Sequence, residues 1–148
     1  MVHQMFDELT ASGSPEFWFY TINAHYFQAI NLWCMVFGTN KNETHWRNLG
    51  IQENLGHRII SSLGITESIY RAYWESVVEW RNKYSAHRVP GFLEATPDLK
   101  IARSVALLFP DWVETNTSIV FGFTLESCEE EFIEQLQASL RTMLEHKK

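Results

Sequence analysis

Apolar side chains recur along the chain with the period of an α-helix. Between residues 16 and 37 they lie three or four positions apart, as in a helix with one face in a core: Phe19, Ile22, Tyr26, Ile30, Trp33 and Phe37. Ser14, Pro15 and Glu16 are typical of a helix start, and Gly38 is typical of a helix end. We therefore expect a helix from about Pro15 to Phe37.

Further helices follow from the same periodicity and from capping residues. Thr66 is placed to cap a long helix that Val89-Pro90-Gly91 cannot continue, and Ser127 with Glu130 resembles a capping box. The helices expected after the first are a short one from Asn42 or Thr44 through His45 and Trp46, and others over 55–63, 67–87, 97–109 and 126–146. The β-branched and aromatic stretch 117–125 is compatible with a strand or an extended arm.

Helices joined by short loops favour an all-α fold, an antiparallel helical bundle. The chain has 148 residues, which suits one compact domain, and no repeat, low-complexity tract or linker divides it. We expect a single domain over residues 1–148, with residues 1–13 flexible and the last helix at 126–146.

The helix expected over 67–87 carries two adjacent apolar stripes. Their members are Ile69, Tyr73, Val77, Trp80, Tyr84 and His87 in one stripe, and Tyr70, Trp74, Val78, Arg81 and Ser85 in the other. An arc this wide exceeds the face that one neighbouring helix covers. Either this helix is central in the bundle, or its second face meets another subunit. We expect a homodimer that uses this helix beside the aromatic stripe of the first one.

Composition and charge exclude several classes of function. The net charge of -6 argues against a protein that coats nucleic acid non-specifically, although it leaves room for a small basic cleft. Cys34 and Cys128 form no CxxC pair, which argues against a disulfide framework or a zinc site and suits a reducing cytosol. Polar residues within 17–37 disfavour a bilayer span, and the N-terminus lacks a signal-peptide core. We expect a cytoplasmic protein without metal, cofactor or membrane association.

Chemically active residues gather at the end of the 67–87 helix, in the segment RNKYSAHR. Arg81 and His87 are six positions apart, so on an ideal helix their side chains point roughly 120° away from each other. They converge only if the helix ends or bends near Ser85 and Ala86, or if two subunits share the site. From spacing alone, the more ordinary interpretation is that Arg81 pairs with a nearby glutamate and His87 interacts with the helix dipole.

An arginine and a histidine are sufficient for metal-free cleavage of RNA. Arg81 would stabilise charge on the phosphorane-like transition state, His87 would move a proton, and Asn82 would hold the phosphate or orient His87. The nucleophile would be the 2′-hydroxyl of the substrate. Cleavage would then leave a 2′,3′-cyclic phosphate and a 5′-hydroxyl, and DNA would survive.

Four further residues are candidates for contacts with the substrate: Lys83, Arg88, His45 and Trp46. Lys83 and Arg88 flank the motif. For His45, a satisfied histidine at a loop–helix junction is the more ordinary interpretation, and Cys34 is most simply a small buried hydrophobe.

The residues around the motif resemble the HEPN family. Its signature is an arginine, a polar residue after it and, with four to six residues in all between, a histidine, here Arg81, Asn82 and His87. Upstream, LWCMVFGTNKNETHW resembles the HEPN subfamily associated with abortive phage infection. In that subfamily an aromatic-Cys-x-x-Phe-Gly segment precedes a His-Trp pair, represented here by Trp33, Cys34, Phe37, Gly38, His45 and Trp46. The resemblance covers about residues 15–110.

This resemblance implies a helical bundle that forms a homodimer, with two Arg–His motifs facing one composite cleft. Many members are metal-independent endoribonucleases, often toxins of defence systems, so an RNA substrate and a neutralising antitoxin are expected. Other members are inactive, and the alternative is therefore a nucleotide-binding or protein-interaction module. The branch that pairs with a nucleotidyltransferase typically has four residues between Arg and His and then a tyrosine two positions later. Five residues and Val89 here argue against that partner.

Overall fold

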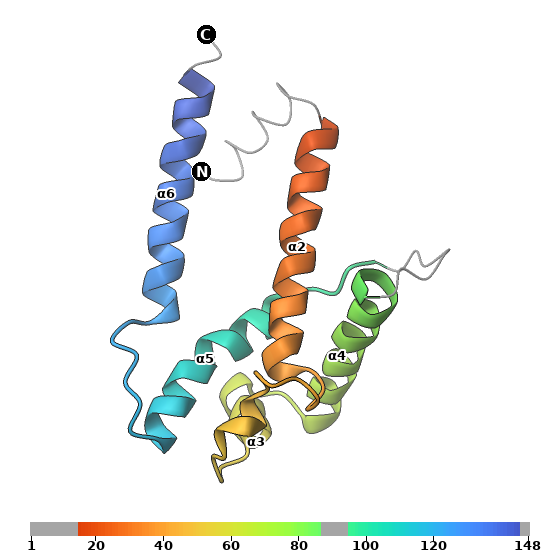
Figure 1. Ribbon diagram of the computed structural model, residues 1–148, viewed down its shortest axis with the longest axis vertical. Helices are drawn as coiled ribbons and strands as arrows, with labels where there is room; N and C mark the ends of the chain where they lie inside the picture. The colour runs from red at the N-terminus through yellow and green to blue at the C-terminus, as the bar shows by residue number, and fades with distance from the viewer. Residues whose placement is uncertain (1–14, 87–94, 146–148) are drawn as a thin grey trace. The chain divides into compact units, whose positions relative to one another are not determined.

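The computed structural model describes residues 15–86 and 95–145, and every regular element in these ranges is a helix. In chain order the elements are α2 (Pro15–Phe37), η1 (Trp46–Leu49), α3 (Leu55–Leu63), α4 (Glu67–Trp80), η2 (Arg81–Ala86), α5 (Lys100–Asn116) and α6 (Leu125–Glu145) (Figure 1). Because no strand occurs in the described ranges, the all-α class is confirmed. Within the same ranges, no helix combines the length and the hydropathy that crossing a membrane requires.

The chain divides into two compact units. Tyr26–Phe121 forms one of them and contains the C-terminal part of α2 together with η1, α3, α4, η2 and α5. Met1–His25 and Gly122–Lys148 form the other, which contains the start of α2 and all of α6. The expectation of a single domain stays a prediction.

The hydrophobic core of the unit Tyr26–Phe121 joins α2, α3, α4 and α5. Two tryptophans of this unit bond across helices: the indole N–H of Trp33 donates to the carbonyl of Ala102 at 3.1 Å, and that of Trp74 donates to the carbonyl of Phe37 at 2.7 Å. The C-terminal part of α2 is thereby held to both α4 and α5 (Figure 1). The buried members of this core are Ile30, Trp33, Cys34, Phe37, Leu55, Ile59, Val77, Val78, Trp80, Ala102, Val105, Trp112 and Val113.

Most described members of the two apolar stripes of α4 are covered within one chain, but Tyr84 stays 38% exposed. Three of their members are buried and three more pack partly buried against the same core: Val77, Val78 and Trp80, then Tyr70, Tyr73 and Trp74. Ile69 stays 52% exposed. Of the two alternatives for the double stripe, a central helix therefore accounts for it, and the stripes themselves require no second subunit.

The predicted inward face of α2 is correct only for its C-terminal part. Ile30, Trp33 and Phe37 are buried, whereas Phe19 is 63% and Ile22 45% exposed. Helical periodicity locates the apolar face of a helix, but it does not say how far along the helix a neighbour covers that face.

Helix starts and stops follow the capping residues at α3 and α4. The side chain of Asn54 accepts the backbone N–H of Gly56 at 2.8 Å, and the hydroxyl of Thr66 accepts that of Ile69 at 3.3 Å. Gly64 ends α3 with a φ of 61°, a left-handed conformation that glycine adopts without strain. The predicted 55–63 helix and the predicted start of the 67–87 helix are confirmed.

The helix predicted over 97–109 is displaced: α5 runs from Lys100 to Asn116. Its start is later because Asp98 stays outside the helix, where its carboxylate accepts the backbone N–H of Lys100 at 2.8 Å. The helix also continues through Pro110, although proline removes a backbone donor. Continuation buries Trp112 and Val113, which are 1% and 2% exposed, and this burial offsets the lost hydrogen bond.

The stretch 117–125 forms neither a strand nor part of a sheet in the described residues. Residues 117–124 are irregular, Val120 is 80% exposed, and Gly122 adopts a φ of 70°. The last helix then starts at Leu125, because the Thr124 hydroxyl accepts the backbone N–H of Ser127 at 3.1 Å. The cap is therefore Thr124, and the capping box predicted at Ser127 is wrong.

Candidate functional site

The predicted motif begins where the helical geometry of the chain changes. α4 ends at Trp80, and the next six residues, Arg81–Ala86, form the π-helical turn η2. The backbone N–H of Arg81 is shared between the carbonyls of Val77 and Val78. Such turns are rare and occur frequently at functional sites. The chain therefore departs from ideal α geometry at Arg81, four residues before Ser85.

The Arg81 side chain is half-buried beside the thiol of Cys34. Burial raises the pKa of the Cys34 thiol, while the charge of Arg81 and its hydrogen bond oppose that rise. The Nε atom of Arg81 is buried and has no hydrogen-bond partner in the described part of the chain. Cys34 itself is 1% exposed, so the prediction of a small buried side chain is confirmed.

No ion pair of the described residues involves Arg81. Glu79, on the preceding turn, pairs with Lys83. The other pairs join Arg58 to Asp111 and Lys100 to Asp98. The ordinary interpretation of Arg81 as the partner of a nearby glutamate is therefore wrong for this part of the chain.

Aromatic rings support the turn that carries Arg81. Trp80 and Tyr84 stack with their ring centroids 4.8 Å apart, and Phe27 of α2 contacts both rings at 5.5 and 5.1 Å. The indole Nε1 of Trp80 is buried, and among the described residues it finds no acceptor. The turn therefore combines close aromatic packing with two unsatisfied buried N–H groups.

The structure brings three predicted site residues into one turn. Arg81, Asn82 and Lys83 are consecutive in η2, and all three are half-buried. His87 and Arg88 lie outside the described residues.

His45 and Trp46 lie apart from that turn. The predicted short helix is η1, and His45 is its N-cap: its Nδ1 accepts the backbone N–H of Arg47 at 3.2 Å. Burial lowers the pKa of His45, and this outweighs the opposing effect of a hydrogen bond with the Gly38 backbone. With both ring nitrogens engaged, His45 is the satisfied histidine at a loop–helix junction that the ordinary interpretation describes.

A cavity of about 540 Å³ adjoins His45 and Trp46. Its walls come from the end of α2 and the loop after it, η1, α3 and residues 67–75 of α4. They include Arg47, Tyr70, Arg71 and Trp74. Arg81 and Asn82 are not part of these walls, so the predicted site residues fall into two separate groups.

Sequence patterns gave no signal for Arg47, Tyr70, Arg71 and Trp74 as lining residues, since only tertiary packing gathers them. Arg47 stands next to the His45-Trp46 pair, and its guanidinium lies 5.3 Å from the Trp46 ring centroid. Adjacency to that pair is the one cue that the sequence offers.

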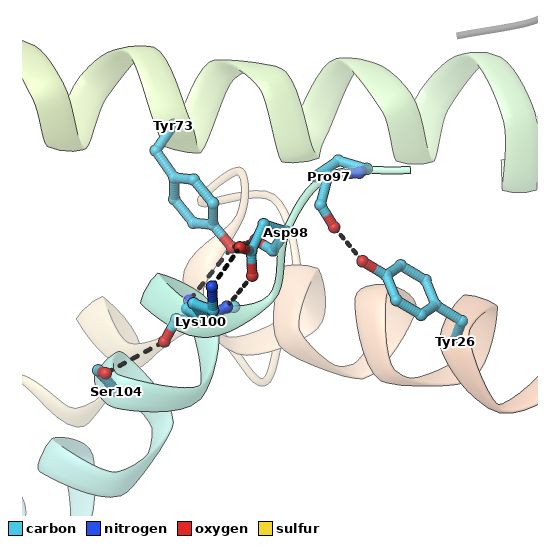
Figure 2. A network of polar contacts seen from close by, with 7 residues as sticks. Tyr26, Tyr73, Pro97, Asp98, Lys100 and Ser104 are labelled. Atoms are coloured by element: carbon cyan, nitrogen blue, oxygen red, sulfur yellow. Dashed lines mark hydrogen bonds and ion pairs between the residues drawn. The ribbon is translucent and has the colours of Figure 1, made fainter. Parts of the chain in front are cut away.

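A network of tyrosine hydrogen bonds holds the chain where it enters α5 (Figure 2). The hydroxyl of Tyr26 donates to the carbonyl of Pro97. The hydroxyl of Tyr73 donates to the carbonyl of Asp98 at 2.9 Å and accepts the N–H of Ala102 at 3.1 Å. Burial, more than any other effect, raises the pKa of Tyr73 to about 12. Residues 97–102 are thereby fixed to both α2 and α4.

Within the described ranges, no three His, Cys, Asp or Glu side chains come together as a metal-binding group. Comparison of this chain with protein-family models, with curated proteins and with solved structures finds no match.

Proposed function

We propose that this chain is a HEPN-type, metal-independent endoribonuclease of the toxin or phage-defence kind. The observation that carries the proposal is the state of Arg81: its half-buried side chain belongs to a π-helical turn and, among the described residues, has no carboxylate partner and no acceptor for its buried Nε. Buried cations are normally paired, because an uncompensated charge costs several kcal/mol. A phosphate group from a ligand supplies the missing anion, and its oxygens match the guanidinium fork.

In the proposed reaction, the 2′-hydroxyl of the RNA attacks the adjacent phosphorus. His87 moves the proton, and Arg81 stabilises the charge that develops on the phosphoryl oxygens. The new 2′-O–P bond forms as the bond from phosphorus to the 5′-oxygen breaks, which gives a 2′,3′-cyclic phosphate and a 5′-hydroxyl. Asn82 holds the phosphate or orients His87, and Lys83 and Arg88 contact the substrate on either side.

We also propose that the active form is a cytoplasmic homodimer, kept in check by an antitoxin. Support for a partner copy comes from the start of α2, where large apolar side chains stay exposed. They are Phe17, Phe19, Tyr20 and Ile22, at 60%, 63%, 70% and 45%. Exposed apolar patches commonly mark protein interfaces. Light scattering should give twice the chain mass at micromolar concentration, and a monomer would contradict the dimer.

One observation favours a second candidate function. The Arg81 guanidinium lies against Cys34, in the seam between α2 and α4, and a catalytic arginine needs an open path to its substrate. A catalytically inactive nucleotide-binding or protein-interaction module of HEPN type meets no such requirement.

Incubation with RNA in EDTA separates the two functions. The ribonuclease predicts that purified protein cleaves RNA without divalent metal, leaves single-stranded DNA intact and produces 2′,3′-cyclic phosphate ends. Cleavage that needs Mg²⁺ or Mn²⁺, or that also degrades DNA, would contradict the mechanism. Inactivity on total cellular RNA and on defined single strands would favour the binding module.

A further inference from the structure

The cavity lined by residues 67–75 of α4 combines aromatic rings with arginine side chains. Trp46, Tyr70 and Trp74 contribute rings, and Arg47 and Arg71 contribute guanidinium groups. Both arginines are exposed, and neither belongs to an ion pair in the described part of the chain. With a volume of about 540 Å³, the cavity is in the size range of sites for small ligands.

From this combination we infer that the cavity binds one unpaired nucleotide of a single-stranded RNA, with its base among the aromatic rings and its phosphate on Arg47. The inference rests on the proposed ribonuclease function for the identity of the strand. It assigns to that enzyme a substrate class, single-stranded RNA, and a binding site separate from Arg81.

Two of the three rings, Trp74 and Trp46, are held by contacts within the chain. Trp74 is fixed because its indole N–H donates to the carbonyl of Phe37 at 2.7 Å. Trp46 is fixed by its edge contact with the buried Trp112, with ring centroids 5.8 Å apart. Rings held in place by such contacts are suited to stacking on a base, and stacking accepts every base because each has a π-face.

The charged residues in the walls distinguish the phosphate of a nucleotide from its base. Arg47 lies over the Trp46 ring, which orients the guanidinium and leaves its N–H edges for phosphate oxygens. Glu67 and Glu75 also line the cavity, four positions before and after Arg71. Their carboxylates repel phosphate but can accept the exocyclic amino group of a base.

One strand can reach both this cavity and Arg81. Trp74 and Arg81 are seven positions apart on one continuous helical segment, which corresponds to roughly 10 Å along its axis. That is about three nucleotides at the ~3.4 Å spacing of a stacked strand. In a duplex the bases are paired and stacked, so the cavity discriminates against double-stranded RNA.

The test measures binding without cleavage. A short fluorescent RNA strand with 2′-O-methyl groups lacks the proposed nucleophile, so wild-type protein can be titrated with it and followed by anisotropy. Arg47→Gln should weaken binding about tenfold, the effect of one lost charge-assisted hydrogen bond. Arg71→Gln, an exposed substitution within a helix, should weaken binding less, because the phosphate is assigned to Arg47. If Arg47→Gln fails to fold, Arg71→Gln still tests the inference.

Arg58→Gln is the matched control. It removes the same charge from α3, but Arg58 is not in the cavity wall and pairs instead with Asp111 at 2.9 Å. Its affinity should stay at the wild-type value, and the same sequence presented as a duplex should bind more weakly. Equal affinities for wild type, Arg47→Gln and Arg71→Gln would overturn the inference, as would equal affinities for single strand and duplex.

A second arm uses adenosine monophosphate in place of the strand. If the mononucleotide binds in an Arg47-dependent manner and the strand does not, RNA is the wrong occupant. Failure of the ribonuclease itself is recognised separately. In that case unmodified RNA would remain uncleaved while Arg47-dependent binding of the strand persisted. Cleavage with Arg47-independent binding would reject the cavity alone.

Discussion

The two ends of α4 differ in how their polar groups are satisfied. Between Thr66 and Trp74, the Thr66 hydroxyl caps the helix, the Trp74 indole N–H donates to Phe37, and the Tyr73 hydroxyl makes two backbone hydrogen bonds. At the C-terminal end, Trp80 Nε1 and Arg81 Nε are buried without partners in the described residues. An unmade hydrogen bond of this kind costs about 1–3 kcal/mol. The hydrogen bonds of the first end stabilise the fold. The unmade hydrogen bonds of the second end destabilise it, and binding of a ligand can offset that loss of free energy.

The largest expected effect on stability is at the satisfied end. Trp74→Ala removes a partly buried indole and leaves the Phe37 carbonyl without its donor. The free energy of unfolding should fall by about 3–5 kcal/mol, the usual cost of truncating a core tryptophan. Urea unfolding followed by circular dichroism measures this loss. A loss below ~1 kcal/mol would show that the N-terminal half of α4 is less essential than its contacts indicate.

An intermediate effect is expected for Tyr73→Phe. This change deletes only the hydroxyl that bonds the Asp98 carbonyl and the Ala102 N–H, as Figure 2 shows for the Tyr73–Asp98 contact. Leaving two backbone groups without partners should reduce the free energy of unfolding by about 1–3 kcal/mol. Ser62→Ala is the control, because it also removes one hydroxyl, and Ser62 is exposed in α3, so its substitution should leave stability unchanged. Equal stabilities for the two variants would contradict the role given to the network.

The smallest effect on stability is expected at Arg81. Arg81→Met keeps the length of the side chain and removes a charge that has no carboxylate partner in the described residues. Replacing a poorly compensated buried charge with an apolar group is often neutral or stabilising, so the change should lie within about 1 kcal/mol of wild type. A loss above ~2 kcal/mol in urea would mean that Arg81 is a structural residue, and the contrast between the two ends would disappear.

The sequence predicted the fold best where local chemistry decides the outcome. Asn54, Gly64 and Thr66 bound α3 and α4 through caps that depend on only a few neighbouring residues. Predictions were wrong where tertiary packing overrode local signals. α5 continues through Pro110 because Trp112 and Val113 enter the core, and Phe19 stays 63% exposed although it continues the apolar stripe of α2.

The candidate site was predictable in part for a similar reason. Spacing indicated that Arg81 and His87 converge only if the helix ends or bends near Ser85 and Ala86, or if two subunits share the site. In the structure a π-helical turn begins at Arg81. That the guanidinium lies beside Cys34 of α2 depends on a contact between distant segments, and no periodicity contains that information. The cavity beside Trp46 belongs to the same class, because Arg71 and Trp74 reach it only through the packing of α4 on η1 and α3.

The most direct test of the ribonuclease is the rate of RNA cleavage in EDTA by wild type, Arg81→Ala and His87→Ala, with Arg58→Ala as the control. The account predicts that the Arg81 and His87 variants lose activity by at least about 100-fold, because each removes a group that acts in the transition state. Their circular dichroism spectra and melting temperatures should match wild type, and Arg58→Ala should cleave at the wild-type rate. Cleavage at the wild-type rate by either Arg81→Ala or His87→Ala would contradict the account.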